Sequence, residues 1–194
     1  MTSITPILEK TYEWCNAQSP KEGILSATLM GISASAATIP VKAFAAHYFS
    51  KGKPISQEVV KKFTADLRLS KPKIVRHNIF VIGFLGPFLE ELFYRTLLQR
   101  NLLPSLFKRS PDHKPTFKEK AFCVLTSSAL FAVTHYEKAA ALHSNRAILA
   151  STFIAGIVYG SLAEVSDSIY SSTVAHSTNN CLSMLRIYHA LRKN

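Results

Sequence analysis

Five apolar stretches alternate with polar and basic segments along the 194 residues, and each is long enough to form a helix. A helix that spans a bilayer needs about 20 predominantly apolar residues. The third and fourth stretches are shorter than that. The pattern predicts an all-α protein, a bundle of about five helices. The stretches are Ile24–Phe49, Ile79–Leu103, Ala121–His135, Ala147–Ala163 and Ser171–Leu191.

Small residues on two of these stretches favour a membrane bundle over a soluble one. Gly156 and Gly160 lie four residues apart in "FIAGIVYGSLA", and the first stretch contains "GISASAA". Small residues at this spacing give flat helix faces, which membrane helices use to approach one another closely. Mean hydropathy is only +0.12, so hydropathy alone does not separate the two classes. With the packing signal added, we expect a multi-pass integral membrane protein.

The connection from Ser50 to Arg76 is polar and basic, but it carries an apolar pattern of its own. Val59, Val60, Phe63 and Leu67 fall at helical spacing, with lysines on the opposite side. This predicts a short amphipathic helix that lies on a surface. The expected organisation is an N-terminal segment (1–23), a first membrane helix with this basic connector (24–76), and a helical core (77–194).

The formal net charge of +11 comes mostly from lysines and arginines between the apolar stretches. Basic connectors between nearly neutral runs are typical of loops that meet anionic lipid headgroups. No zinc finger, RNA-recognition motif or glycine-rich phosphate loop is present, so we expect no nucleic-acid partner. Three widely spaced cysteines without a CxxC pair also argue against a disulfide framework or a structural zinc site.

The second apolar stretch contains three charges in "GPFLEELFYR". Glu91 and Arg95 are four residues apart in the order that favours an intrahelical ion pair, which would neutralise two charges that are costly away from water. Glu90 lies about 100° around the helix and has no such partner in its own turn. We expect Pro87 to start or kink the helix, which would leave both acids near an amino-terminal end.

Two later stretches carry polar residues at the same helical spacing. Phe131 and His135 are four apart near the end of the third stretch, and His176 and Asn180 are four apart in the fifth. A single histidine on an apolar helix is more often a core residue than a catalyst. Together with Glu90, however, these residues come from three helices and form a polar cluster that a bundle can close around.

This set of groups fits hydrolysis by an activated water. Glu90 and His135 could hold and deprotonate the water. His176 and Asn180 could donate hydrogen bonds to the oxyanion that forms when water adds to an amide carbonyl. No serine or cysteine is arranged with a base in these motifs, so an acyl-enzyme is not expected. HExxH is absent, yet a metal bound by Glu90, His135 and His176 stays open at this point.

Three motifs in this order resemble those of the CPBP family, also called Abi, which comprises CAAX proteases and bacteriocin-processing enzymes. "EELFYR" resembles EExxxR, "FAVTH" resembles FxxxH, and "HSTNN" resembles HxxxN. The resemblance extends over roughly Phe84 to Leu185, about half of the chain. It implies an intramembrane glutamic protease with an all-helical fold and a four-helix catalytic core.

The resemblance also implies a role for each site residue. Glu90 and His135 would activate the water, and His176 and Asn180 would form the oxyanion hole, without a metal or other cofactor. The residues that would support the site are Glu91, Arg95 and Phe131. The expected partners are the lipid bilayer and a peptide or protein substrate, with a prenylated CAAX-type protein as one candidate.

Two other functions remain as alternatives. In the first, the same fold serves a non-enzymatic membrane protein, immunity-like or partner-binding, and the polar cluster only locks the helices together. In the second, the chain is a soluble helical effector.

Overall fold

The first apolar stretch forms one uninterrupted helix, α2 (Ile24–Phe49), with the bounds that the sequence predicts. The computed structural model describes residues 23–53, 77, 79–107, 113–138 and 140–192. All regular secondary structure within these residues is helical, which confirms the predicted fold class. The amphipathic helix predicted around Val59, Val60, Phe63 and Leu67 lies outside the described residues.

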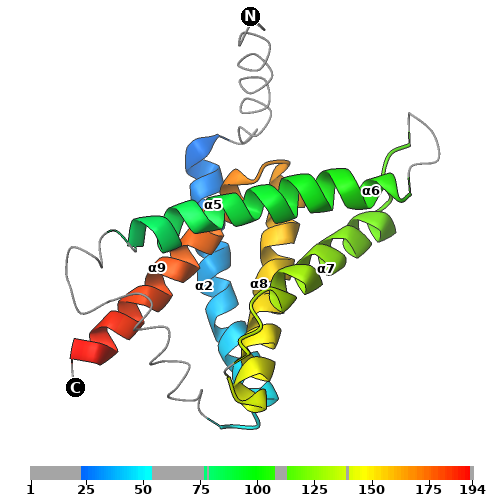
Figure 1. Cartoon of the computed structure of the whole chain (residues 1–194). Helices are drawn as coiled ribbons and strands as arrows, with labels where there is room; N and C mark the ends of the chain where they lie inside the picture. Colours follow the sequence, from blue (N-terminus) through cyan, green and yellow to red (C-terminus); the bar gives the residue numbers. More distant parts are fainter. Residues whose placement is uncertain (1–22, 54–76, 78, 108–112, 139, 193–194) are drawn as a thin grey trace, which may run out of the picture.

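The second stretch forms a long helical rod of four consecutive segments. They are η1 (Val81–Leu85), α5 (Gly86–Glu91), η2 (Leu92–Leu102) and α6 (Leu103–Ser105), and η1 and η2 have the wider π-helical hydrogen-bond pattern. The residues at the three junctions keep right-handed helical backbone angles, so the rod continues through them (Figure 1).

The expectation for Pro87 was wrong. Helical backbone already runs from Ile79 to Pro87, so Glu90 and Glu91 lie well inside the rod and not near an amino-terminal end. Proline lacks the N–H of a helical hydrogen bond, and a π-helical turn is a common way to absorb such an interruption. The turn immediately before Pro87, η1, has that geometry.

Three further helices complete the bundle: α7 (Phe117–Val133), α8 (Leu142–Ser166) and α9 (Tyr170–Arg192). A capping box starts α7, because the Thr116 hydroxyl accepts from the Glu119 amide and the Glu119 carboxylate accepts from the Thr116 amide. Asp167 ends α8 in the left-handed conformation, with φ of 50°.

Helix α8 begins five residues before the predicted stretch. The segment before Ala147 is polar, but its Asn145 is buried. Asn145 accepts a hydrogen bond from the Glu137 amide and donates one to the Glu137 carbonyl. Because the preceding turn satisfies this polar side chain, the helix extends to 25 residues, which is long enough to cross a bilayer.

Close helix packing is made at small residues, as the sequence predicts. In Figure 1, α2 runs beside α8 and α9, α7 runs beside α8, and the rod crosses the bundle. A Cβ on Gly31 would lie 2.6 Å from the Ser171 carbonyl, and one on Gly156 would lie 2.9 Å from Ser128 Cβ. The absence of side chains at these glycines therefore lets α2 approach α9 and lets α8 approach α7.

Among the residues that the structure describes, two helices, α2 and α8, are long and apolar enough to cross a membrane. Only 22% of the apolar window of α2 and 28% of that of α8 are buried, so neither is the enclosed core helix of a soluble protein. The rod also exposes large apolar side chains, among them Phe84, Leu89 and Phe93. Extended apolar exposure of this kind is typical of a surface that meets lipid or a partner.

Candidate active site

A buried ion pair on the rod forms the centre of the site. Arg95 Nε lies 3.1 Å from Glu91 Oε2, and neither side chain has any exposed surface. Arg95 Nη1 donates to Ser127 Oγ on α7 at 3.0 Å, and the guanidinium lies 5.6 Å from the Phe131 ring centre. The geometry confirms the predicted Glu91–Arg95 pair. The mutual attraction of the two charges and the hydrogen bonds of Arg95 Nε and Nη1 offset part of the cost of burying the pair, and Arg95 Nη2 is buried without a partner among the described residues.

Glu91 also reaches a second helix. Its other oxygen, Oε1, lies 3.1 Å from His176 Nδ1 on α9. An ionised carboxylate only accepts hydrogen bonds, so this contact places a proton on Nδ1. Glu91 therefore fixes the orientation of the His176 ring, in addition to pairing with Arg95.

Glu90 lies on the other side of His176. Its Oε2 is 3.6 Å from His176 Nε2, so the imidazole lies between the two adjacent glutamates. The Glu90 side chain is 38% exposed, but its Oε2 is buried and has no hydrogen-bond partner among the described residues. Glu90 thus has one buried carboxylate oxygen on a side chain that is otherwise partly exposed.

His135 contacts the cluster through an aromatic neighbour. It follows the last turn of α7, and its side chain is exposed. Among the described residues, Glu90 makes its ion-pair contact with His176, and His135 joins the cluster through the Phe131 ring at 4.7 Å between ring centres. His135 Nδ1 lies 2.8 Å from the Phe131 carbonyl oxygen. A carbonyl only accepts, so Nδ1 carries the proton and Nε2 of the neutral ring can accept one.

Aromatic rings enclose His176 within the bundle. Tyr159 on α8 stacks on it, with ring centres 4.7 Å apart and planes 19° apart, and Phe131 meets it edge-on at 5.5 Å. The sequence reasoning included Phe131 but missed Tyr159. The available signal was its place between Gly156 and Gly160, on a turn where α8 lies close to its neighbours.

Asn180 lies one helical turn after His176 but contacts a different part of the rod. Its Nδ2 donates to the Ile82 carbonyl at 3.1 Å. The pair predicted on α9 is therefore divided, since His176 reaches the glutamates and Asn180 reaches the turn before Pro87.

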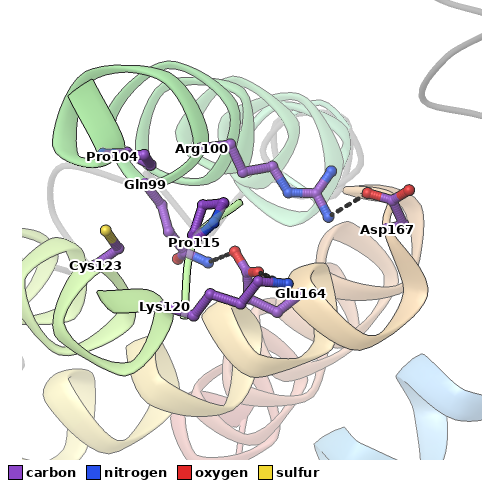
Figure 2. Close-up of a pocket in the computed structure, with 8 residues that line it drawn as sticks. All are labelled: Gln99, Arg100, Pro104, Pro115, Lys120, Cys123, Glu164 and Asp167. Atoms are coloured by element: carbon purple, nitrogen blue, oxygen red, sulfur yellow. Dashed lines mark hydrogen bonds and ion pairs between the residues drawn. The ribbon is translucent and has the colours of Figure 1, made fainter. Parts of the chain in front are cut away.

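A chain of hydrogen bonds leads from the ion pair to the far end of the rod. Gln99 is buried next to Arg95, and its Nε2 donates to the Gly160 carbonyl at 3.1 Å and to Glu164 Oε1 at 2.9 Å. Figure 2 shows Gln99 and Glu164 joined by this hydrogen bond, and both residues line a pocket of about 380 Å³. The ion pairs Lys120–Glu164 and Arg100–Asp167 balance the charges that line this cavity.

The candidate metal ligands are not gathered into one site. Within the part of the chain that the structure describes, no three histidine, cysteine, aspartate or glutamate side chains are arranged to hold a metal ion.

Comparison with known proteins gives one match. The family model described as Type II CAAX prenyl endopeptidase Rce1-like matches residues 74–182, more than half of the chain. The protein belongs to this Rce1-like family. No curated protein and no solved structure matches the chain.

Membership of the Rce1-like family identifies the chain as a protease, a peptide hydrolase that acts on protein substrates. The family is membrane-embedded, which agrees with the two candidate spans α2 and α8. All residues of the candidate site lie within the matched segment.

Proposed function

We propose that this Rce1-like protein is a multi-pass intramembrane endopeptidase that hydrolyses a peptide bond with a water activated by Glu90, without a metal or other cofactor. One observation carries the proposal. Glu90 presents a buried carboxylate oxygen without a hydrogen-bond partner among the described residues, 3.6 Å from a histidine that Glu91 orients. A carboxylate in this state is a strong acceptor for the proton of a water.

His135 assists Glu90 in activating the water. Its Nε2 is the unprotonated nitrogen of the neutral ring, because Nδ1 donates to the Phe131 carbonyl. The side chain is exposed, so in this orientation Nε2 is available to a water that binds with the substrate. The proton that leaves the water passes to the leaving amine as the peptide bond breaks.

His176 and Asn180 stabilise the oxyanion. Glu91 holds Nδ1 of His176, and donation from Nε2 to the scissile carbonyl oxygen requires a proton on that nitrogen as well. Asn180 supplies the second donor from its carboxamide. Loss of one such donor typically costs about 10²- to 10³-fold in kcat. Arg95 and Phe131 support this arrangement by holding Glu91 and the His176 ring.

The proposed substrate is a prenylated CAAX-type protein. A cavity of about 550 Å³ with mostly apolar walls lies between α2, η1 and α9. Its lining includes Ser177 and Cys181, which directly follow His176 and Asn180 in the sequence, together with Phe84 from the rod. A prenyl chain in this cavity would gain about 0.8 kcal/mol for each buried CH₂ group, and the peptide would extend toward the site.

The bilayer is the other proposed partner. We further propose that residues 77–194 form the catalytic core, with 24–76 as a membrane helix and basic connector and 1–23 as a separate segment. Because α2 packs on α8 and α9, the first membrane helix would support the cavity wall through Thr28.

The experiment is cleavage of a peptide panel by the purified protein in lipid, with each peptide tested with and without a farnesyl group. We expect cleavage of the farnesylated form, and a loss of at least about 100-fold in kcat for Glu90→Gln. The matched control is Glu119→Gln, which makes the same chemical change at a capping position where glutamine also fits. Equal activity of Glu90→Gln and the wild type would refute the mechanism.

Two further arms separate the alternatives. Cleavage that persists in a strong chelator would support a metal-independent reaction. If the chelator abolishes cleavage and an added metal restores it, metal independence is refuted. Absence of cleavage by a well-folded wild type would favour the non-enzymatic alternative. Thr178→Trp in the cavity should raise KM for the farnesylated peptide alone, whereas Leu185→Trp, which does not line the cavity, should not.

A further inference from the structure

The turn before Pro87 leaves one backbone carbonyl without its helical partner. In η1 the Gly86 amide donates to the Val81 carbonyl, five residues earlier. The next donor in this pattern would be the amide of residue 87, and its acceptor would be the carbonyl of Ile82. Proline has no N–H, so residue 87 cannot supply the donor that this pattern assigns to the Ile82 carbonyl.

That carbonyl is the acceptor for Asn180. Asn180 Nδ2 on α9 lies 3.1 Å from the Ile82 oxygen, although the two residues are 98 positions apart in the sequence. A buried backbone carbonyl without a partner is costly, and Asn180 removes this cost. The acceptor also determines which end of the carboxamide points toward the rod, since only the nitrogen can donate.

Close approach of α9 to this turn depends on Gly83. A Cβ at that position would lie 2.7 Å from Cys181 Sγ, closer than side chains pack. Gly83 is buried, and Pro87 is among the most buried side chains of the protein. The contact between Asn180 and the Ile82 carbonyl is therefore part of a tightly packed crossing of α9 and the rod.

We propose that Pro87 is a positioning residue for Asn180: the carbonyl that it frees anchors one N–H of the carboxamide and leaves the second N–H to donate to the substrate. This inference rests on the proposed function, in which Asn180 is an oxyanion donor. An asparagine amide has two donors in one plane, and its terminal torsion is broad when nothing holds it. Fixing one N–H fixes the direction of the other, so the oxyanion donor is oriented before the substrate arrives.

The variant Pro87→Ala tests the inference. Alanine returns the amide N–H at residue 87, which competes with Asn180 for the Ile82 carbonyl, and it favours helix more than proline does, so the variant should fold. We expect kcat for the prenylated peptide to fall about 10-fold with little change in KM, because a donor loses its orientation and no substrate contact is removed. The matched control is Pro104→Ala, near the other end of the rod, which should leave kcat unchanged.

A double-mutant cycle separates positioning from general structural damage. If Pro87 acts through Asn180, Pro87→Ala should have no further effect on kcat/KM in an Asn180→Ala background. Multiplicative losses in the double variant, or wild-type kcat in Pro87→Ala, would overturn the inference.

The same double-mutant cycle can be measured by the Tm of thermal unfolding, which does not require the protein to be active. Asn180→Ala should lower Tm by about 3 °C in the wild type and by less in the Pro87→Ala background, where the restored amide already satisfies the carbonyl. Equal Tm losses in the two backgrounds would show that the Ile82 carbonyl does not anchor Asn180, whatever the activity measurements give. Absence of cleavage by the wild type together with coupled Tm values would refute the proposed function and retain the anchor.

Discussion

The same substitution at the two adjacent glutamates should change the stability of the protein by very different amounts. Glu91 is fully buried and bonded at both oxygens, to Arg95 Nε at 3.1 Å and to His176 Nδ1 at 3.1 Å. In Glu91→Gln the amide nitrogen must face one of these donors, and the Arg95 charge loses its counter-charge. Removing one partner of a buried pair costs about 3–5 kcal/mol.

This cost converts to a measurable shift. For a protein of this size 1 kcal/mol corresponds to about 2–4 °C in Tm, so Glu91→Gln should lower Tm by roughly 6–20 °C. Glu90 is 38% exposed, and its contact with His176 is 3.6 Å. Exposed pairs contribute about 0–1 kcal/mol, so Glu90→Gln should shift Tm by less than about 4 °C while it removes activity.

The assay is thermal unfolding in lipid or detergent, followed by the helical circular dichroism signal, with cleavage measured on the same samples. A control tests the assigned cause. Because replacing both partners of a buried pair by apolar residues is often neutral, Glu91→Leu/Arg95→Met should be more stable than Glu91→Leu and should remain inactive. Equal Tm values for Glu90→Gln and Glu91→Gln would refute the distinction between the two acids.

Substitutions at three further positions test other parts of the protein. His135→Ala should lower kcat by about 10²- to 10⁴-fold if His135 acts as a base. Because its side chain is exposed, the free energy of unfolding should change by less than about 0.5 kcal/mol. A large fall in Tm with retained kcat would contradict the role of His135 as a base. Tyr159→Phe keeps the ring that stacks on His176 and should retain most activity. Tyr159→Ala removes the ring, so it should lower kcat and reduce the free energy of unfolding by about 3–5 kcal/mol. Equal kcat values for the two variants would show that the stacked ring does not contribute to activity. Gly156→Ala places a Cβ 2.9 Å from Ser128 Cβ and 3.1 Å from Ser128 Cα. This overpacking should lower the free energy of unfolding by about 1–3 kcal/mol. An unchanged Tm would show that α7 and α8 can separate at little cost.

The local features of the site could be predicted from the sequence. The ion pair of Glu91 and Arg95 follows from a spacing of four, since helix geometry alone brings such side chains together. The close approach at Gly156 follows from the small residues themselves. The bounds of α2 follow from the apolar pattern, because Ser50 and the basic residues after it end the apolar run.

The start of α8 and the backbone at Pro87 could not be predicted in the same way. A polar start to a helix is recognised only when its buried partners are known, as for Asn145 and the Glu137 backbone. A proline in a helical pattern is normally taken as a boundary. Here the rod continues because a π-helical turn absorbs the missing hydrogen bond and α9 supplies Asn180 as a donor.

The sequence by itself determined the five helices, the three motifs and the presence of one glutamate beyond the ion pair. Only the tertiary structure decided that His176 lies between Glu90 and Glu91, and that His135 joins the cluster through Phe131. The physical reason is that spacing along one helix fixes which side chains share a face, whereas contacts between helices depend on their rotation and crossing. In this protein the small residues at the crossings set that rotation. The rotation in turn determines that His176 is the histidine that meets Glu90.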